Sequence, residues 1–103
     1  MCGISGVINL AGRRDVSAGV IERMARALVH RGPDEVGYLR KPGLALASRR
    51  LSVVGLADGQ QPMANEEKNV HCVFNGEFFD HPEKRAGLID RGHHLHTHCD
   101  TEI

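Results

Sequence analysis

The sequence predicts an α+β domain, because segments with strand patterns alternate with segments of helical periodicity. Residues 3–10 form an apolar run rich in β-branched side chains, which indicates a buried strand. From Ser17 onward, the apolar residues recur at helical spacing: Val20, Ile21, Met24, Ala25, Leu28 and Val29. Ser17 is the expected N-cap of this helix, and Gly32-Pro33 is expected to end it. We therefore expect a sheet layer with a helix packed against it.

The next part of the chain has the pattern of short strands joined by tight turns. Strands are predicted near residues 37–40 and 44–48, with the turn tripeptide Lys41-Pro42-Gly43 between them. Arg50 follows the second strand, and residues 51–54 are expected to continue in extended conformation. These strands would supply the remainder of the sheet.

The second half of the sequence predicts one more strand and one more helix. Residues 65–69 read as a polar hairpin tip, and residues 70–74 alternate so that Val70, Cys72 and Phe74 share one face. A helix is predicted after Asp80, with Glu83 three residues later in the pattern of a capping box, and Gly92 is expected to end it. Its inward-facing residues are expected to be Ala86, Leu88 and Ile89.

Composition excludes several classes of function. The chain has 103 residues, of which 41% are hydrophobic and 25% charged, as in an ordinary small globular domain. Thirteen basic and thirteen acidic residues cancel, and aromatic residues are scarce. Neither a nucleic acid nor a membrane is therefore expected as a partner. Three widely spaced cysteines do not form a disulfide framework, and no signal peptide is recognisable, so we expect a cytoplasmic protein.

Cys2 is the first candidate for chemistry, because removal of Met1 would make it the first residue. Its thiol and a free α-amino group would then lie on neighbouring carbons. An unperturbed α-amine has a pKa of about 7.7–8.0, so near neutral pH part of it can accept a proton from the thiol. Nucleophile and base would then belong to one residue. On position alone, a small apolar residue that opens a strand is the commoner interpretation of Cys2.

Three polar groups elsewhere in the sequence have a structural as well as a functional interpretation. The loop His30-Arg31-Gly32-Pro33-Asp34 suits the wall of a site, but it also suits a helix C-terminus with its favourable cations. Asn75-Gly76-Glu77 contains the Asn-Gly pair of many hairpin turns. Arg50 alone would usually be a solvated surface charge, as we expect of its neighbour Arg49.

The C-terminal segment offers a different function. In a strand, His94, His96 and His98 would share one face and could hold zinc, although spacing dictates no fourth ligand. A histidine-based zinc module is therefore an alternative. Asp100-Thr101-Glu102 is typical of the beginning of a helix, yet the sequence ends one residue later. We expect the sequence to be part of a longer protein.

Six short motifs, taken together and in this order, resemble those of the class II glutamine amidotransferases: Met1-Cys2-Gly3-Ile4, His30-Arg31-Gly32-Pro33-Asp34, Arg50-Leu51-Ser52, Gln61-Pro62, Asn75-Gly76-Glu77 and Asp100-Thr101-Glu102. The His-Arg-Gly-Pro-Asp form is most similar to the glutaminase domain of glutamine-hydrolysing asparagine synthetases. The resemblance implies an N-terminal-nucleophile hydrolase fold, an αββα sandwich with stacked, largely antiparallel sheets. It also implies that residues 1–103 are the first half of this domain and that the synthetase domain is absent from this chain.

The resemblance assigns catalytic roles to three residues. Cys2 would attack the side-chain amide of glutamine to give a thioester and ammonia, with its own amine as base and then as acid. The Asn75 side chain and the Gly76 backbone N–H would form the oxyanion hole. No metal or other cofactor is implied for this step. A glutaminase of the same class that serves a different acceptor is the other alternative.

The resemblance also assigns substrate binding and partners. Adjacent side chains of an extended chain point to opposite faces, so only one of Arg49 and Arg50 can face the pocket, and the resemblance implies that Arg50 binds the α-carboxylate of L-glutamine. Asp100, helped by Glu77, would bind the α-ammonium group. The ammonia would pass to a C-terminal synthetase domain that uses ATP and Mg²⁺ to amidate aspartate. We expect the 103-residue chain alone to be a poor glutaminase and to form a homo-oligomer, because its sheet edges would be open.

Overall fold

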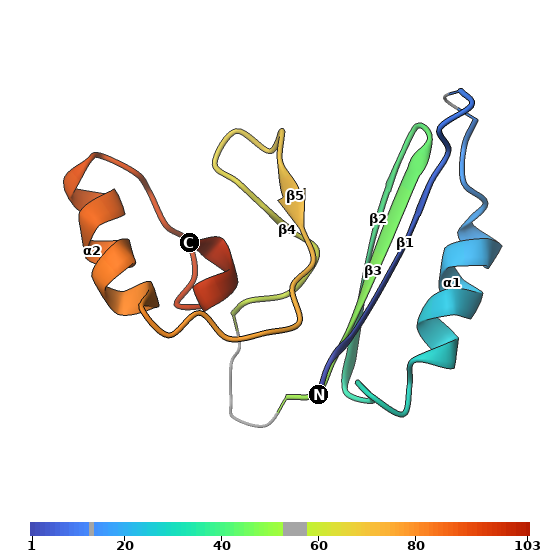
Figure 1. Cartoon of the computed structure of the whole chain (residues 1–103), viewed down its shortest axis with the longest axis horizontal. Coiled ribbons are helices and arrows are strands. Elements are labelled where there is room, and N and C mark those ends of the chain that lie inside the picture. The colour runs from blue at the N-terminus through green and yellow to red at the C-terminus, as the bar shows by residue number, and fades with distance from the viewer. Residues whose placement is uncertain (13, 53–57) are drawn as a thin grey trace.

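The computed structural model describes residues 1–12, 14–52 and 58–103. In the described part, the elements follow in the order β1 (Gly3–Ile8), α1 (Ala18–Ala27), β2 (Glu35–Lys41), β3 (Leu44–Arg50), β4 (Met63–Ala64), β5 (His71–Cys72), α2 (His81–Asp90) and the 3-10 turn η1 (Asp100–Glu102). β1, β3 and β2 form an antiparallel sheet in that order, and β4 pairs with β5, also antiparallel. Helices beside antiparallel sheets confirm the α+β class (Figure 1).

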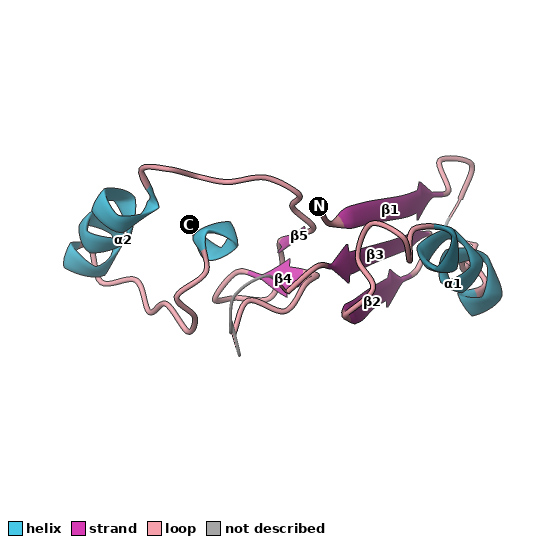
Figure 2. Cartoon of the chain, turned by 90° about the horizontal axis from the view of Figure 1, so that it is seen from below, coloured by secondary structure: helices cyan, strands magenta, loops and turns pink. Residues whose placement is uncertain are grey.

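The three-stranded sheet is the central layer of the molecule. α1 lies against one side of it and the β4–β5 pair lies on the other side, as two perpendicular views show (Figures 1 and 2). α2 lies beyond the β4–β5 pair, away from the sheet (Figure 1). This arrangement agrees with the predicted αββα sandwich as a partial domain. In the part of the chain that the structure describes, no helix is long and apolar enough to span a membrane.

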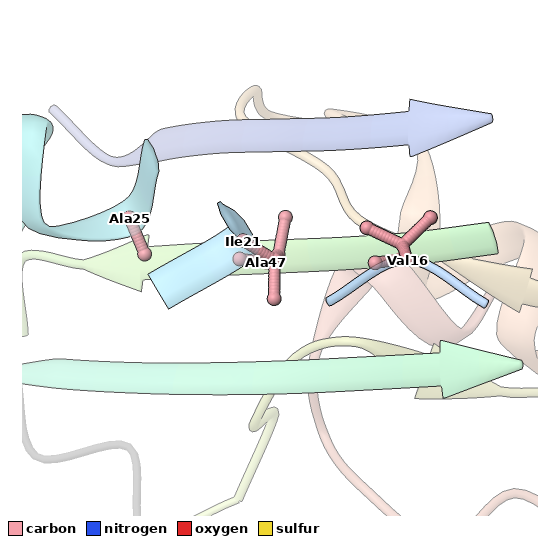
Figure 3. Close-up of a cluster of buried hydrophobic side chains, with 5 residues drawn as sticks. Val16, Ile21, Ala25 and Ala47 are labelled. Carbon is pink, nitrogen blue, oxygen red and sulfur yellow. The ribbon is translucent and has the colours of Figure 1, made fainter. Parts of the chain in front are cut away.

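The hydrophobic core lies between α1 and the sheet (Figure 3). Its buried residues are apolar and come from β3, from α1 and from the segment before α1: Val16, Ile21, Ala25, Ala45 and Ala47. The small side chains of the two β3 alanines let the helix lie close to the strand, and Ile21 fills the space between them with only 1% of its surface exposed. Helical periodicity from Ser17 therefore identified the covering helix correctly.

The register of the sheet places neighbouring β3 side chains on opposite faces. Arg49 is the partner of Gly3 in β1, and Arg50 is the partner of Glu35 in β2. Because side chains alternate along a strand, Arg49 lies on the α1 face, whereas Ser48 and Arg50 lie on the face toward β4 and β5. The expected opposition of the two arginines is thus present in the structure.

α1 begins where the sequence predicts and ends earlier. Ser17 is the N-cap residue, but its side chain makes no capping hydrogen bond. The predicted end at Gly32-Pro33 was wrong, since the helix stops at Ala27 and the N–H of Leu28 bonds to the carbonyl of Ala25, three residues back. The tighter turn brings Leu28 against Gly3 of β1, where an added Cβ would lie 3.0 Å from the Leu28 Cβ.

The two predicted hairpin tips are present. Lys41 and Leu44 are paired across the first turn, and Gly43 adopts a φ of 74°, a conformation that glycine accepts without steric cost. In the second tip, the Asn65 side chain accepts hydrogen bonds from the backbone N–H groups of Asn69 and Val70. Part of the extended segment predicted at residues 51–54 lies outside the described residues.

The five-residue strand predicted at residues 70–74 was too long. Only His71 and Cys72 pair with β4. The N–H of Phe74 instead bonds to the side chain of Gln61, which takes this residue out of strand pairing. The short pairing leaves the chain free to turn toward Asn75 directly afterwards.

α2 has the predicted ends but not the predicted buried face. It follows Asp80, and Gly92 lies just beyond it with a φ of 92°, as expected of a glycine that ends a helix. The Asp80 side chain makes no capping hydrogen bond. Ala86 and Ile89 are exposed, contrary to the prediction, and no residue of the helix is buried. The reason is that α2 lies away from the sheet (Figure 1).

Candidate active site

One cavity of about 530 Å³ is lined by all six residues that the sequence assigns to chemistry or substrate binding: Cys2, Arg50, Asn75, Gly76, Glu77 and Asp100. They come from four separate parts of the chain, namely the residue before β1, the end of β3, the loop between β5 and α2, and the start of η1. Proximity in sequence cannot bring these parts together, so the fold itself assembles the group.

Cys2 is half-buried just before β1, and the loop at residues 30–34 contacts its backbone. Arg31 Nε donates a hydrogen bond to the Cys2 carbonyl oxygen at 3.1 Å. Gly32 lies so close to β3 that a Cβ there would be 2.4 Å from the carbonyl carbon of Arg49. The N–H of Asp34 donates to the Arg50 carbonyl at 3.1 Å.

This loop was expected to form a wall of the site, but none of the described residues lining the cavity comes from it. It contacts instead the backbones of two residues that line the cavity, Cys2 and Arg50. The His-Arg-Gly-Pro-Asp motif therefore positions the site from outside the cavity.

Arg50 forms an ion pair with Glu35, a residue to which the sequence analysis assigned no role. Its side chain is 11% exposed, and its Nη1 lies 3.1 Å from Glu35 Oε2. The two residues are cross-strand partners in β2 and β3. A sequence signal for this pair would have required the register of the hairpin, which the Lys41-Pro42-Gly43 turn could have supplied.

Arg49 is not the solvated charge that we expected. It is half-buried on the α1 face of the sheet, and its Nε donates to the carbonyl of Ala25 at 3.3 Å. Ala25 lies in the last turn of α1, and its carbonyl accepts this bond in addition to the one from the N–H of Leu28. Arg49 therefore joins helix to sheet, whereas Arg50 faces the cavity.

The loop Asn75-Gly76-Glu77 is exposed on the opposite side of the cavity. A Cβ at Gly76 would lie 2.6 Å from the ring of Phe74, so the loop folds closely over that ring. The N–H of Phe78 donates to Asp100 Oδ2 at 2.8 Å. This bond connects the loop that carries the candidate oxyanion hole to the carboxylate expected to bind the substrate ammonium group.

Glu102 organises the turn that presents Asp100. Its carboxylate accepts hydrogen bonds from the N–H groups of His96 and Thr97 and from the Thr97 hydroxyl, at 2.6–2.8 Å. Burial raises the pKa of Glu102, but these hydrogen bonds and the nearby Arg85 outweigh it, so the pKa is lower than that of an ordinary glutamate. The ionised carboxylate thus stabilises residues 96–102.

Several lining residues had no predicted role. Sequence reasoning missed the part of the cavity wall made by Gln61, Phe74, His81, Cys99 and Thr101. The Gln61-Pro62 motif was recognised only as part of the resemblance. Gly59 packs against Cys99. Its φ of 94° and the 3.0 Å between an added Cβ and the Cys99 sulfur both require glycine at position 59, so this glycine is the one sequence feature that could have indicated a close contact there.

The strand that the zinc alternative would need is absent from this segment. Residues 93–99 form no strand, and two of the histidines in this segment bond to different carboxylates. His93 Nδ1 lies 3.0 Å from Glu66, and His98 Nδ1 lies 2.9 Å from Asp58. These hydrogen bonds lower the pKa of each carboxyl below its ordinary value. Across residues 1–12, 14–52 and 58–103, no three His, Cys, Asp or Glu side chains are grouped as metal ligands, so the zinc alternative is not favoured.

Comparison with known proteins gives the same family as the motifs. A family model described as a glutamine amidotransferase domain matches residues 1–103. Asparagine synthetase [glutamine-hydrolyzing] 1 of Bacillus subtilis is 37% identical over 106 residues, covering 100% of this chain and 17% of the relative. The enzymes of Sandersonia aurantiaca and of Pisum sativum nodules are each 36% identical over 103 residues, with 19% and 17% of their lengths covered.

The chain thus spans less than a fifth of the length of these relatives. The match nevertheless extends over the whole chain, and the cavity joins the six residues that the motifs single out. The chain belongs to the glutamine amidotransferase domain family.

Proposed function

We propose that this chain is the glutaminase part of an asparagine-synthetase-like enzyme and hydrolyses free L-glutamine to glutamate and ammonia. The observation that carries the proposal is that one cavity is lined by a candidate nucleophile, candidate oxyanion donors and charged groups of both signs. A small zwitterionic amide needs each of these groups at a different point of its surface.

In the proposed reaction, the Cys2 thiol loses its proton to the free α-amine and the thiolate attacks the amide carbon of glutamine. Negative charge then develops on the amide oxygen, and N–H groups of Asn75 and Gly76 stabilise it. The protonated amine gives its proton to the departing nitrogen, which leaves as ammonia while a thioester forms on Cys2. Water, activated by the same amine, attacks the thioester and releases glutamate. No metal or other cofactor takes part in these steps.

The proposal requires Met1 to be removed, because an amide nitrogen is not a base. Met1 is 77% exposed, so the residue to be removed lies at the surface. The Arg31 contact that holds Cys2 goes to the carbonyl oxygen and not to the amino nitrogen.

Charges at the two ends of the substrate explain why free glutamine would be selected. Arg50 donates one N–H toward Glu35, and a guanidinium has five N–H donors, so others can bind the α-carboxylate. Asp100, with Glu77, would bind the α-ammonium group. A glutamine inside a peptide lacks both charges, so the interactions with Arg50 and with Asp100 would be lost, at a cost in binding.

The wider assignments belong to the same proposal. The named relatives are glutamine-hydrolysing asparagine synthetases. By analogy, we propose that the ammonia passes to a synthetase domain that amidates aspartate with ATP and Mg²⁺. We also propose that the protein acts in the cytoplasm and self-associates.

The decisive experiment replaces Cys2 in the full-length protein. Cys2→Ala should abolish glutamate formation from glutamine, while asparagine synthesis from added ammonia continues. Intact-mass measurement of the active wild-type protein should show that Met1 is missing. Retained Met1 in active protein, or glutamine hydrolysis by Cys2→Ala, would overturn the proposed mechanism.

A further inference from the structure

The side chain of Gln61 connects three parts of the chain that each carry a group of the candidate site. Its Oε1 accepts a hydrogen bond from the N–H of Phe74 at 2.7 Å and a longer one from the Ser48 hydroxyl at 3.5 Å. Its Nε2 donates to the Thr101 hydroxyl at 3.2 Å. Gln61 itself lines the cavity.

Each contact lies next to a candidate site residue. Phe74 immediately precedes Asn75, and Thr101 immediately follows Asp100. Ser48 is 1% exposed. It lies two residues before Arg50 in β3 and therefore on the same face of the strand. The three contacts therefore relate the oxyanion loop, the ammonium-binding turn and the carboxylate-binding strand to one another.

A primary amide is suited to this position by its chemistry. The Phe74 N–H needs an acceptor, and the Thr101 hydroxyl accepts from a donor. The amide of a glutamine side chain carries both an acceptor oxygen and a donor NH₂ group on the same carbon. Glutamate keeps the acceptor and loses the donor. Methionine has a similar length and shape but neither group.

The main chain at this position is constrained as well. Gly37 of β2 lies against the Gln61 carbonyl, and a Cβ at Gly37 would lie 1.7 Å from that oxygen. No residue other than glycine fits there without moving the chain. The backbone of Gln61 thus packs directly against the sheet, which fixes the position from which its side chain extends.

We infer that Gln61 is a positioning residue for glutamine hydrolysis: it sets the distances between the oxyanion donors, Asp100 and Arg50. This inference rests on the proposed function. Gln61 acts through its neighbours and takes no part in proton transfer or bond formation. Misplacement of a reacting geometry by about 1 Å can lower a rate by roughly 100-fold, so an effect of this size is expected from its loss.

The test compares Gln61→Met with Gln60→Met in the full-length protein. Gln60 is the exposed neighbour and serves as the matched control. Gln61→Met should lower kcat/KM for glutamine by roughly 100-fold, through both kcat and KM, because both the oxyanion loop and Asp100 lose their support. Gln60→Met should stay within about twofold. Synthesis from added ammonia and the rate of Cys2 alkylation by iodoacetamide should be unchanged in both variants.

Two milder variants separate the hydrogen bond of Gln61 to Phe74 from its hydrogen bond to Thr101. Thr101→Val removes the Gln61 contact next to Asp100, together with the weaker hydrogen bond that the Cys99 thiol donates to the same hydroxyl at 3.4 Å, and it leaves the Phe74 contact in place, so it should raise KM with little change in kcat. Gln61→Glu retains the acceptor for Phe74 and should keep more of kcat than Gln61→Met does.

Equal glutaminase kinetics of Gln61→Met and Gln60→Met would overturn the inference. A fall in ammonia-dependent synthesis parallel to the loss of glutaminase activity would also overturn it, because that pattern indicates general unfolding. Wild-type protein without glutaminase activity would instead refute the proposed function, so the two failures are distinguishable.

Discussion

The two halves of this chain are stabilised in different ways. Among the described residues, the buried apolar cluster lies entirely within residues 1–50 and is built from α1, β3 and the segment that precedes α1. In the described residues 58–103, no apolar side chain is buried, and the side-chain oxygens of Asn65, Gln61 and Glu102 organise the loops by accepting hydrogen bonds from backbone N–H groups. Cys2 and Arg50 are therefore attached to a packed layer, whereas Asn75 and Asp100 depend on polar contacts. Packing and hydrogen bonding thus each support one side of the same cavity.

The largest effect expected from this contrast is on stability. Ile21→Ala leaves a cavity beneath α1, and such changes cost about 2–5 kcal/mol. Ile89→Ala makes the same chemical change on α2, where the side chain is 53% exposed, and should stay within about 0.5 kcal/mol. Urea denaturation followed by circular dichroism measures both. Similar losses in the two variants would show that the second half also has a packed core.

The second expected effect is on substrate binding at the packed side of the cavity. Arg50→Lys keeps the charge but loses the planar fork, so KM for glutamine should rise roughly 10-fold or more. Arg49→Lys should leave KM within about twofold and should instead lower stability by about 1 kcal/mol, because the bond to Ala25 is weakened. Steady-state kinetics and denaturation of the two variants separate these outcomes. A larger change in KM for Arg49→Lys than for Arg50→Lys would contradict the assignment of Arg50 to substrate binding.

A smaller, pH-dependent effect is expected on the polar side. The pKa of Glu102 is lowered in the folded state, so its ionised form stabilises the fold above the pKa of an unfolded glutamate, about 4.3. That contribution is lost as the pH falls through the lower folded-state pKa. Glu102→Gln should therefore be less stable than wild type at pH 7, and the difference should shrink toward pH 3. Denaturation curves across this range provide the measurement, and a difference that grows on acidification would contradict the assignment.

The smallest effect is expected at the helix starts. Replacement of an N-cap serine by alanine usually costs about 1 kcal/mol. Ser17 makes no capping hydrogen bond, so Ser17→Ala should change the free energy of unfolding by less than about 0.5 kcal/mol. A loss near the usual value would show that the hydroxyl is used.

Prediction from sequence succeeded where a local pattern carried the information. The apolar spacing after Ser17 identified α1, and the turn Lys41-Pro42-Gly43 identified the β2–β3 hairpin. Both features depend on residues within a few positions of one another. The inward face assigned to α2 failed because periodicity states which residues share a face and not whether another element covers it.

The candidate site was predictable only in part, for a similar reason. The six residues were found through short motifs, each one local. Their supports, Glu35 for Arg50 and Gln61 for Phe74, act across distances of 15 and 13 residues in sequence and follow from register and loop course. The zinc alternative needed three aligned histidines, but His93 and His98 bond to Glu66 and Asp58, which are remote in sequence and could not be inferred from a local pattern.

The contact between Arg31 and the Cys2 carbonyl has a consequence for the order of maturation. The hydrogen bond is made on the carboxyl side of Cys2, and the pairing of β1 begins one residue later at Gly3. Cleavage of the Met1–Cys2 bond therefore changes the charge of the nitrogen without altering the contacts that locate the residue. In the proposed mechanism, the chain would thus fold before Met1 is removed, and a single hydrolysis at Met1 would then supply the base beside the thiol.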